Sequence, residues 1–174
     1  MPGIGKHIPW QPGFFQHLLA NLRLVVRCLP QFAAFNALRT VMNAWPTSAR
    51  VAQAIAPCCF GCGGDDSLMH YCSCPKVIAV CLDLVPMVTG FINDPLFLLG
   101  LFPLNASRGC DKPLIFTAGL LADALFSARS EAVHSGRPPN LRASFLGRFK
   151  QIARSSAKAR ARLMRVCCQV ECID

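Results

Sequence analysis

The sequence is poor in acidic residues. Its 174 residues include nine Asp and Glu against eighteen Lys and Arg, and the first acidic residue along the chain is Asp65. Paired-carboxylate catalysis and two-metal catalysis both need several carboxylates that converge on one site. Because the nine are dispersed along the chain, we expect neither chemistry.

Familiar catalytic motifs are also missing. The chain has no G-x-S-x-G, P-loop, Rossmann or H-E-x-x-H sequence, and His7, His17 and His134 stand alone. Cys–His nucleophilic catalysis is the remaining enzymatic alternative, because His70 lies near many thiols. A nucleophile needs a single thiol, however, whereas several thiols around one imidazole suit a metal ion. We therefore predict that the chain is not an enzyme.

The sequence shows neither a secretory signal nor an uninterrupted apolar span. Residues 1–12 are rich in Pro and Gly and lack the apolar core of a signal peptide. The longest apolar zone, 77–102, is interrupted by Asp83, Pro86 and Gly90, whereas a spanning helix needs about 20 apolar residues. We therefore expect no transmembrane segment and an intracellular, reducing location, where cysteines bind metal rather than form disulfides.

Cysteine, by contrast, is abundant and concentrated in the segment 57–75. This segment holds five of the eleven cysteines and one of the four histidines. Cys59 and Cys62 form a C-x2-C pair, a spacing that lets one tight turn offer two sulfurs to one metal. His70 and Cys74 follow at i and i+4, so a short helix would place both on one face. The pattern predicts a Cys3His zinc site with Cys59, Cys62, His70 and Cys74 as ligands.

The choice of ligands stays open at two positions. Cys58 can replace Cys59, which gives C-x3-C, and Cys72 can replace Cys74. We prefer Cys74 because an H-x-C pair is too short to close a tetrahedron comfortably from a helix. The plainer alternative is that these cysteines are small buried hydrophobic residues.

Turn and helix signals surround the predicted ligands. The three glycines within 61–64 allow the positive φ that a tight turn needs. Asp65 or Asp66 is expected to cap the helix that carries His70. Pro75 suits the first turn of a following helix.

The basic residues gather near the end of the sequence. No acidic residue lies between Glu131 and Glu171, so the segment from Arg137 to Arg165 is strongly cationic. Such a segment indicates contact with a polyanion, nucleic acid first and an acidic membrane surface second, and a solvated helical face is the plainer alternative. The predicted nucleic-acid contacts are Arg39, Arg50, Arg142, Arg148, Lys150, Arg154, Lys158, Arg160, Arg162 and Arg165.

Apolar periodicity predicts a helical protein. No segment alternates strongly enough to indicate a strand. The expected fold class is all-α, a helical domain with an inserted Cys3His zinc turn. The expected helices cover residues 14–28, 32–44, 47–54, 77–85, 95–102, 112–133 and 141–164.

We divide the chain into three parts. Residues 1–12 form an irregular lead, 13–135 a helical domain that contains the zinc knuckle 57–75, and 136–174 a basic helix with a tail. The second half of that basic helix has few apolar residues and is expected to become ordered on a partner. Near its end, Cys167, Cys168 and Cys172 are interpreted as loose thiols.

Three stretches of the sequence form a wider pattern: Asn36–Arg50, Cys59-x2-Cys62-Gly63 and Asp66-Ser67-Leu68-x-His70-Tyr71-x2-Cys74-Pro75. This pattern resembles the region after the polymerase domain in non-LTR (LINE-type) retrotransposon reverse transcriptases. In that family a helical stretch with leucine and arginine leads into a C-x2-C…H-x3–4-C knuckle. The resemblance implies that Cys59, Cys62, His70 and Cys74 bind zinc.

The resemblance also implies a function. In that family the knuckle region is thought to help hold template RNA or target DNA. The chain is therefore expected to bind RNA or DNA, with the polymerase part of a reverse transcriptase as a further partner. The catalytic polymerase motifs are missing, so the chain looks like a remnant or fragment of such an enzyme. The alternatives are a zinc-dependent protein-interaction module and a decayed open reading frame without function.

Overall fold

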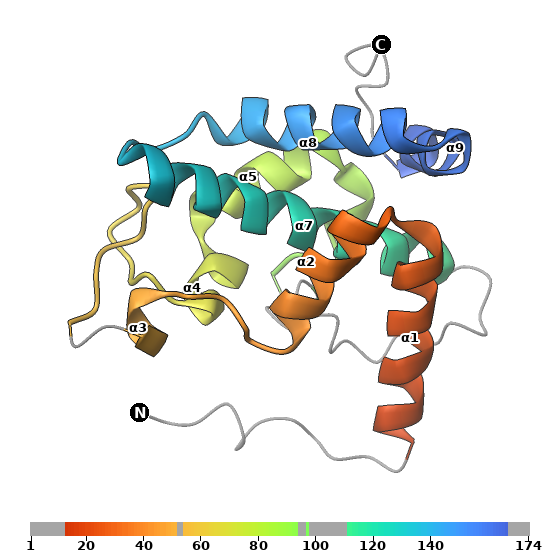
Figure 1. Ribbon diagram of the computed structural model, residues 1–174, viewed down its shortest axis with the longest axis horizontal. Helices are drawn as coiled ribbons and strands as arrows, with labels where there is room; N and C mark the ends of the chain where they lie inside the picture. The colour runs from red at the N-terminus through yellow and green to blue at the C-terminus, as the bar shows by residue number, and fades with distance from the viewer. Residues whose placement is uncertain (1–12, 52–53, 94–96, 98–110, 167–174) are drawn as a thin grey trace.

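The computed structural model describes residues 13–51, 54–93, 97 and 111–166, and this part of the chain is built from helices (Figure 1). No strand occurs among these residues, although Pro57 and Asp65 form an isolated antiparallel bridge. The predicted all-α class with an inserted Cys3His cluster is therefore confirmed. The helices are α1 (Phe14–Cys28), α2 (Gln31–Val41), α3 (Ser48–Val51), α4 (Leu68–Ser73), α5 (Pro75–Leu84), the 3-10 helix η2 (Pro86–Val88), α7 (Asp111–Ser135), α8 (Leu141–Ser155) and α9 (Ala157–Val166).

Helix α7 is the centre of the fold. It contacts α1, α2, α8, α9 and η2, and every residue from Ile115 to Leu125 is buried. A helix that is apolar on nearly all sides must be covered on nearly all sides, which explains its central place. Gly119 lets α1 approach closely, since a Cβ there would lie 3.0 Å from Val25 and 3.2 Å from Leu29.

The other helices cover α7 from several directions. Helix α8 packs along α7 and also contacts α5, and α9 continues the same layer (Figure 1). Helix α2 packs across α7 and against α1. The cysteine-rich segment and α3 lie at the end of the molecule opposite α1 and α9 (Figure 1). The predicted metal site therefore lies at the opposite end of the molecule from α9 (Figure 1).

The bounds of α1 and α2 can be compared with those predicted from apolar periodicity. Helix α1 begins and ends where it is predicted, but α2 ends at Val41 rather than at residue 44. The chain turns at Asn43, whose φ is 49°, a left-handed conformation that Asn tolerates better than most residues. The turn places Trp45 in the core, where its Nε1 donates to Thr40 Oγ1 at 3.0 Å.

The predicted basic helix is divided in two. Ser156 adopts an extended conformation (φ −163°, ψ 143°) that ends α8, and its Oγ accepts a hydrogen bond from Ala159 N at 3.0 Å. Ser156 thus caps α9, as Ser commonly does at a helix start. Helix α9 buries Ala159, Leu163 and Val166. The expectation that this half becomes ordered only on a partner is therefore wrong, because its sparse apolar residues suffice to pack it on α7 and α8.

Some expectations concern residues outside the described ranges. These are the irregular lead 1–12, most of the predicted helix 95–102, and the three C-terminal cysteines Cys167, Cys168 and Cys172. Within the described ranges, no helix combines the length and the apolar character that crossing a membrane requires.

Candidate metal centre

Four potential metal ligands converge at one point. The ligand atoms of Cys58, Cys62, His70 and Cys74 all lie within 4.8 Å of one another, and Cys62 Sγ lies 3.0 Å from His70 Nε2. In a tetrahedral site with metal–sulfur bonds of about 2.3 Å, neighbouring sulfurs are roughly 3.8 Å apart. The cluster therefore has the size and the donor set of a four-ligand metal site.

The cluster takes Cys58 where the spacing favoured Cys59. Cys62, His70 and Cys74 converge as expected, but Cys59 points elsewhere, and its Sγ lies 3.2 Å from Tyr71 Oη. The two cysteines are adjacent, and the sequence alone offers no feature that decides which of them faces inward. The arrangement is thus the C-x3-C alternative rather than C-x2-C.

Cys72, the alternative to Cys74, lies outside the cluster. It is fully buried on α4, and burial raises the pKa of its thiol to about 12. Burial also raises the pKa of the Cys81 thiol on α5, and electrostatic repulsion from Cys72 adds to this increase. Both residues fit the plainer interpretation of cysteine as a small core side chain.

Backbone hydrogen bonds close the loop that carries the first two sulfurs. Cys58 N donates to Gly64 O at 2.7 Å, and Gly61 N donates to Cys58 O at 2.9 Å. Gly61 and Gly63 have φ of 68° and 87°, in the left-handed region that favours glycine. These bonds bring the two ends of the loop together, so that Cys58 and Cys62 face the same point.

Gly64 is required for a different reason. Its φ is not positive, but a Cβ on it would lie 2.7 Å from His70 Nε2 and closer still to the neighbouring ring atoms. The backbone of the loop therefore lies directly against the imidazole. Only glycine leaves room for the ring to reach the three sulfurs.

Ser67 positions His70 by capping α4. Its Oγ accepts a hydrogen bond from His70 N at 3.2 Å, which satisfies one of the free amides of the first turn. The expectation that Asp65 or Asp66 caps this helix is wrong, because the Asp66 side chain is held by other groups. Sequence reasoning passed over Ser67 although Ser is a preferred cap.

Cys74 stands at the junction of two helices. It follows the last residue of α4 and precedes Pro75, the first residue of α5, and its conformation is extended (φ −64°, ψ 123°). Pro75 thus occupies the helix start for which it is suited. His70 and Cys74 converge on one point although α4 ends before Cys74.

The three thiols of the cluster differ in acidity. Burial tends to raise the pKa of Cys62, but the backbone of Gly64 and the thiols of Cys58 and Cys74 outweigh it, and the pKa is lowered. Burial raises the pKa of Cys58 to about 12, and it raises the pKa of Cys74 against the opposing amides of α5. Cys62 is therefore the thiol that ionises first. A bound cation favours ionisation of the other two, so that metal binding displaces their protons.

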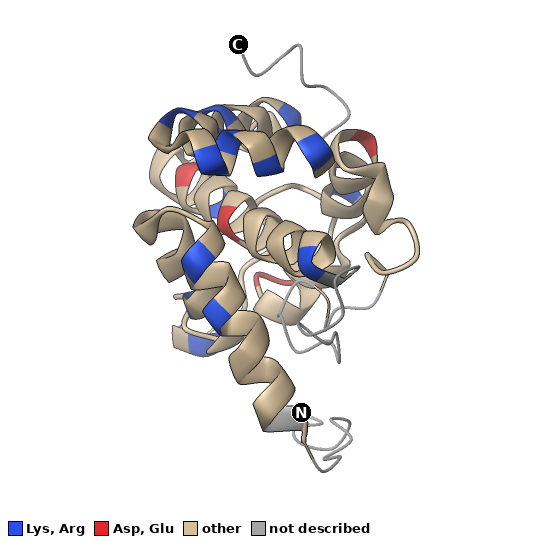
Figure 2. Ribbon diagram, turned by 90° about the vertical axis from the view of Figure 1, so that its right-hand side faces the viewer, with Lys and Arg blue, Asp and Glu red and all other residues tan. Residues whose placement is uncertain are grey.

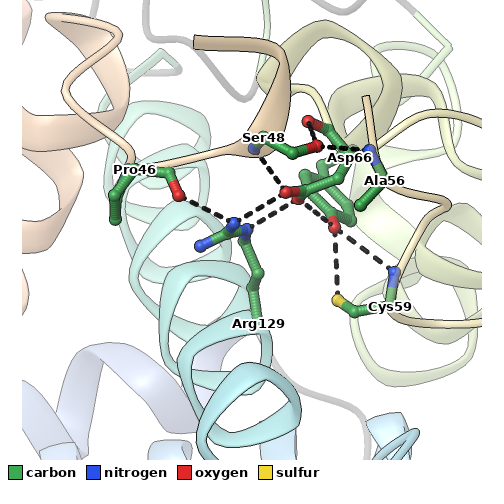
Figure 3. Close-up of polar contacts among 7 residues, drawn as sticks. Pro46, Ser48, Ala56, Cys59, Asp66 and Arg129 are labelled. Atoms are coloured by element: carbon green, nitrogen blue, oxygen red, sulfur yellow. Dashed lines mark hydrogen bonds and ion pairs between the residues drawn. The ribbon is translucent and has the colours of Figure 1, made fainter. Parts of the chain in front are cut away.

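Asp66, which lies between Cys62 and His70 in the sequence, forms a buried ion pair with Arg129 (Figure 3). Arg129 Nε and Nη2 donate to the two carboxylate oxygens of Asp66, both at 3.0 Å. Ser48 N donates to Oδ2 of the same carboxylate at 2.6 Å, and Arg129 Nη2 also donates to Pro46 O at 3.0 Å. This network joins α7, the start of α3 and the cysteine-rich loop.

Tyr71 extends this network to Cys59. Its hydroxyl donates to Asp66 Oδ1 at 2.6 Å, and since the group has one hydrogen, Cys59 receives none from it. Cys59 Sγ lies 3.2 Å from Tyr71 Oη, so the S–H of Cys59 can donate to the Tyr71 oxygen. Burial raises the pKa of Cys59, which agrees with a thiol that stays protonated. Cys59 therefore belongs to the polar network and not to the metal cluster.

Several of the predicted nucleic-acid contacts are engaged inside the protein. Arg148 Nε pairs with buried Asp123 at 2.7 Å, and Arg142 Nε pairs with Asp83 at 2.9 Å on the surface. Arg39 lies over the ring of Phe35, with Cζ 4.4 Å from the ring centroid. These three arginines therefore have structural partners already.

The remaining predicted contacts are divided between two ends of the molecule. Arg50 is exposed on α3, which lies at the opposite end from α9 (Figure 1). Lys150 is half-buried on α8, and half-buried Arg162 donates from Nη1 to Cys28 O at 3.4 Å. The exposed ones on α8 and α9 are Arg154, Lys158, Arg160 and Arg165. Figure 2 shows this cationic layer along the top of the molecule.

Comparisons with known proteins found no match among protein-family models, curated proteins or solved structures. The fold and the candidate site are therefore inferred from the sequence and structure of this chain alone. The resemblance to the reverse-transcriptase knuckle stays a prediction, and the cluster departs from its C-x2-C pair by taking Cys58 in place of Cys59.

Proposed function

We propose that this protein is a zinc-stabilised domain that binds nucleic acid. The observation that carries the proposal is the separation of two features. A closed set of metal ligands organises one end of the molecule, and an exposed cationic layer on α8 and α9 lies away from it.

The donor set favours zinc as the metal. Three thiolates and one imidazole in a compact cluster suit a tetrahedral, borderline-soft cation, whereas magnesium and calcium prefer oxygen ligands. Four protein ligands fill the tetrahedron and leave no position for a reactive water, so the role of the ion is structural. It would join the loop of Cys58 and Cys62 to the junction of α4 and α5.

The distribution of charge supports a polyanionic ligand. Among the acidic side chains in the described part of the chain, Asp66, Asp83 and Asp123 are each paired with an arginine, and Glu131 accepts from Ser144 Oγ at 2.8 Å. Asp65 is exposed near the cysteine-rich end. Two of these pairs neutralise Arg142 and Arg148 on α8, whereas none of the three involves the exposed Arg154, Lys158 or Arg165. These exposed cations give the electrostatic footprint expected of a nucleic-acid surface.

The origin of the domain follows from the sequence resemblance. We infer that it derives from the region after the polymerase domain of a LINE-type reverse transcriptase, with the polymerase part as a further partner. The Cys3His composition of the cluster supports this origin, whereas its C-x3-C spacing departs from it.

Salt-dependent binding tests the nucleic-acid proposal. Fluorescence anisotropy with labelled RNA and DNA oligonucleotides should show affinity that falls as salt rises, with a slope in log K against log salt of about 0.7–0.9 per phosphate contacted. The double variant Arg154→Gln/Lys158→Gln should reduce both the affinity and this slope. The control Lys76→Gln/Arg137→Gln removes the same charge from exposed positions elsewhere and should change both much less. Binding that ignores salt, or responds equally to both variants, would contradict the proposal.

A second candidate function is a zinc-dependent protein-interaction module. The specific observation in its favour is exposed apolar surface: Leu19 and Val26 on α1 are both 51% exposed, and Met42 after α2 is 75% exposed. Co-purification of a stoichiometric protein partner, with no binding of any oligonucleotide, would favour this candidate.

A further inference from the structure

Two phenylalanine side chains lie exposed on α2. Phe32 is 36% and Phe35 is 54% exposed, and their i, i+3 spacing places them on one side of the helix. Gln31 lines a shallow hollow together with both rings. Single exposed apolar residues are ordinary on protein surfaces, but here two neighbouring aromatic rings line one hollow and expose apolar surface to solvent together.

Each ring is held by an arginine. Cζ of Arg148 lies 4.4 Å from the ring centroid of Phe32, and Cζ of Arg39 lies 4.4 Å from that of Phe35. A guanidinium over an aromatic face is attracted by the ring quadrupole. The rings are therefore oriented before any ligand arrives, which lowers the entropy lost on binding.

The arginines are fixed in turn. Arg148 donates from Nε and Nη2 to the two carboxylate oxygens of Asp123, at 2.7 and 2.8 Å, and from Nη1 to Gln151 at 2.6 Å. Arg39 also faces Phe126, with Cζ 5.5 Å from that ring centroid. Because the donors of Arg148 are engaged by protein groups, it supports a ring rather than binding phosphate directly. We therefore assign Arg148 the role of positioning Phe32, in place of the predicted contact with nucleic acid.

We propose that Phe32 and Phe35 form a stacking platform for the bases of a single-stranded nucleic acid. This inference rests on the proposed function and specifies its substrate class. Aromatic side chains stack on any unpaired base, whereas a duplex hides its base faces along its length. Neither α2 nor α8 contains an acidic residue, so the platform and its supporting helix repel no phosphate.

The test combines a change in the protein with a change in the ligand. Anisotropy is measured with a labelled single-stranded oligonucleotide, the same strand with its central bases replaced by abasic sites, and the corresponding duplex. Phe32→Leu/Phe35→Leu removes the aromatic faces but keeps apolar, helix-compatible side chains. The matched control Leu19→Ala/Val26→Ala removes exposed apolar surface from α1. Far-UV circular dichroism verifies that each variant is folded.

The wild type should bind the intact strand more tightly than the abasic strand, by roughly tenfold for each base stacked. The double Phe variant should lose that difference and keep the salt dependence, because phosphate contacts are unaffected. If the wild type binds no nucleic acid, the proposed function fails, and this inference with it. If it binds but the Phe variant retains the preference for intact strands, or loses duplex and single-strand binding equally, the stacking platform alone is overturned.

Discussion

Arg129 and Asp66 form a buried, bidentate ion pair between residues 63 positions apart in the sequence. Their side chains are 5% and 10% exposed, so water screens the pair little. Asp66 lies between Gly64, which packs on the His70 ring, and Ser67, which caps the helix of His70. The ion pair therefore connects the central helix α7 directly to the metal-binding segment.

Removing Arg129 should destabilise the protein severely. Arg129→Met fills a similar volume but leaves the Asp66 carboxylate buried without its charge partner, a change that costs about 3–5 kcal/mol in comparable cases. The free energy of unfolding from urea denaturation measures the effect. Arg142→Met is the control, because its pair with Asp83 is about half exposed and such pairs contribute about 0–1 kcal/mol. Equal effects of the two substitutions would contradict the role given to Arg129.

The stability that Asp66 contributes should depend on pH. Burial alone would raise the pKa of Asp66, but the hydrogen bonds from Arg129 and Tyr71 outweigh it and hold the pKa below its ordinary value of 3.8. The unfolded chain therefore takes up this proton first as pH falls. The contribution is fully present above pH 3.8 and is lost as pH falls through the lowered pKa.

Asp66→Asn provides the comparison. The difference in unfolding free energy between the wild type and Asp66→Asn should be constant near neutral pH and shrink below about pH 4. Protonation of metal ligands affects both proteins alike and cancels in this difference. A difference that stays constant down to strongly acidic pH would show that Asp66 is not the group responsible.

Much of the fold could be predicted because it depends on local patterns. The bounds of α1 follow from apolar spacing. Those of α7 follow from a long apolar run with Pro113 in its first turn and Gly136 just after its last residue. The break at Ser156 could not be predicted in this way, because no Gly or Pro marks it, and Ser155 and Ser156 can lie within a helix as well as cap one. A single serine that can cap the next turn decides there between one helix and two.

The sequence predicts which kinds of residue form the candidate site, but not the choice of Cys58 over Cys59 or the long-range contacts that support the site. Spacing located the loop, His70 and Cys74, since ligand spacing depends on short-range geometry. The contact between Asp66 and Arg129 joins distant segments, and nothing in the local sequence indicates it. The same contact explains Cys59, because Tyr71, which donates to Asp66, also lies beside the Cys59 thiol.

Gly64→Ala should weaken metal binding without removing any ligand. The added methyl group would overlap the imidazole of His70 and push it away from the sulfurs. Disturbing groups that orient ligands commonly lowers metal affinity by about 10–100-fold, which competition with a zinc chelator can measure. Gly147→Ala is the control, since a Cβ at that helical position meets nothing within 4 Å. It should leave affinity unchanged and raise stability by about 0.5–1 kcal/mol.

Cys58→Ser should lower the metal content, whereas Cys59→Ser should leave it unchanged. Cys58→Ser removes one of four converging ligand atoms, so the reduced, purified variant should hold much less than one zinc per chain. Cys59→Ser changes only a contact with Tyr71, so it should keep about one zinc and lose on the order of 1 kcal/mol of stability. Elemental analysis, with titration of released metal, measures both. If Cys59→Ser lost the metal and Cys58→Ser retained it, the ligand set would be the C-x2-C arrangement, and the network through Tyr71 would need another explanation.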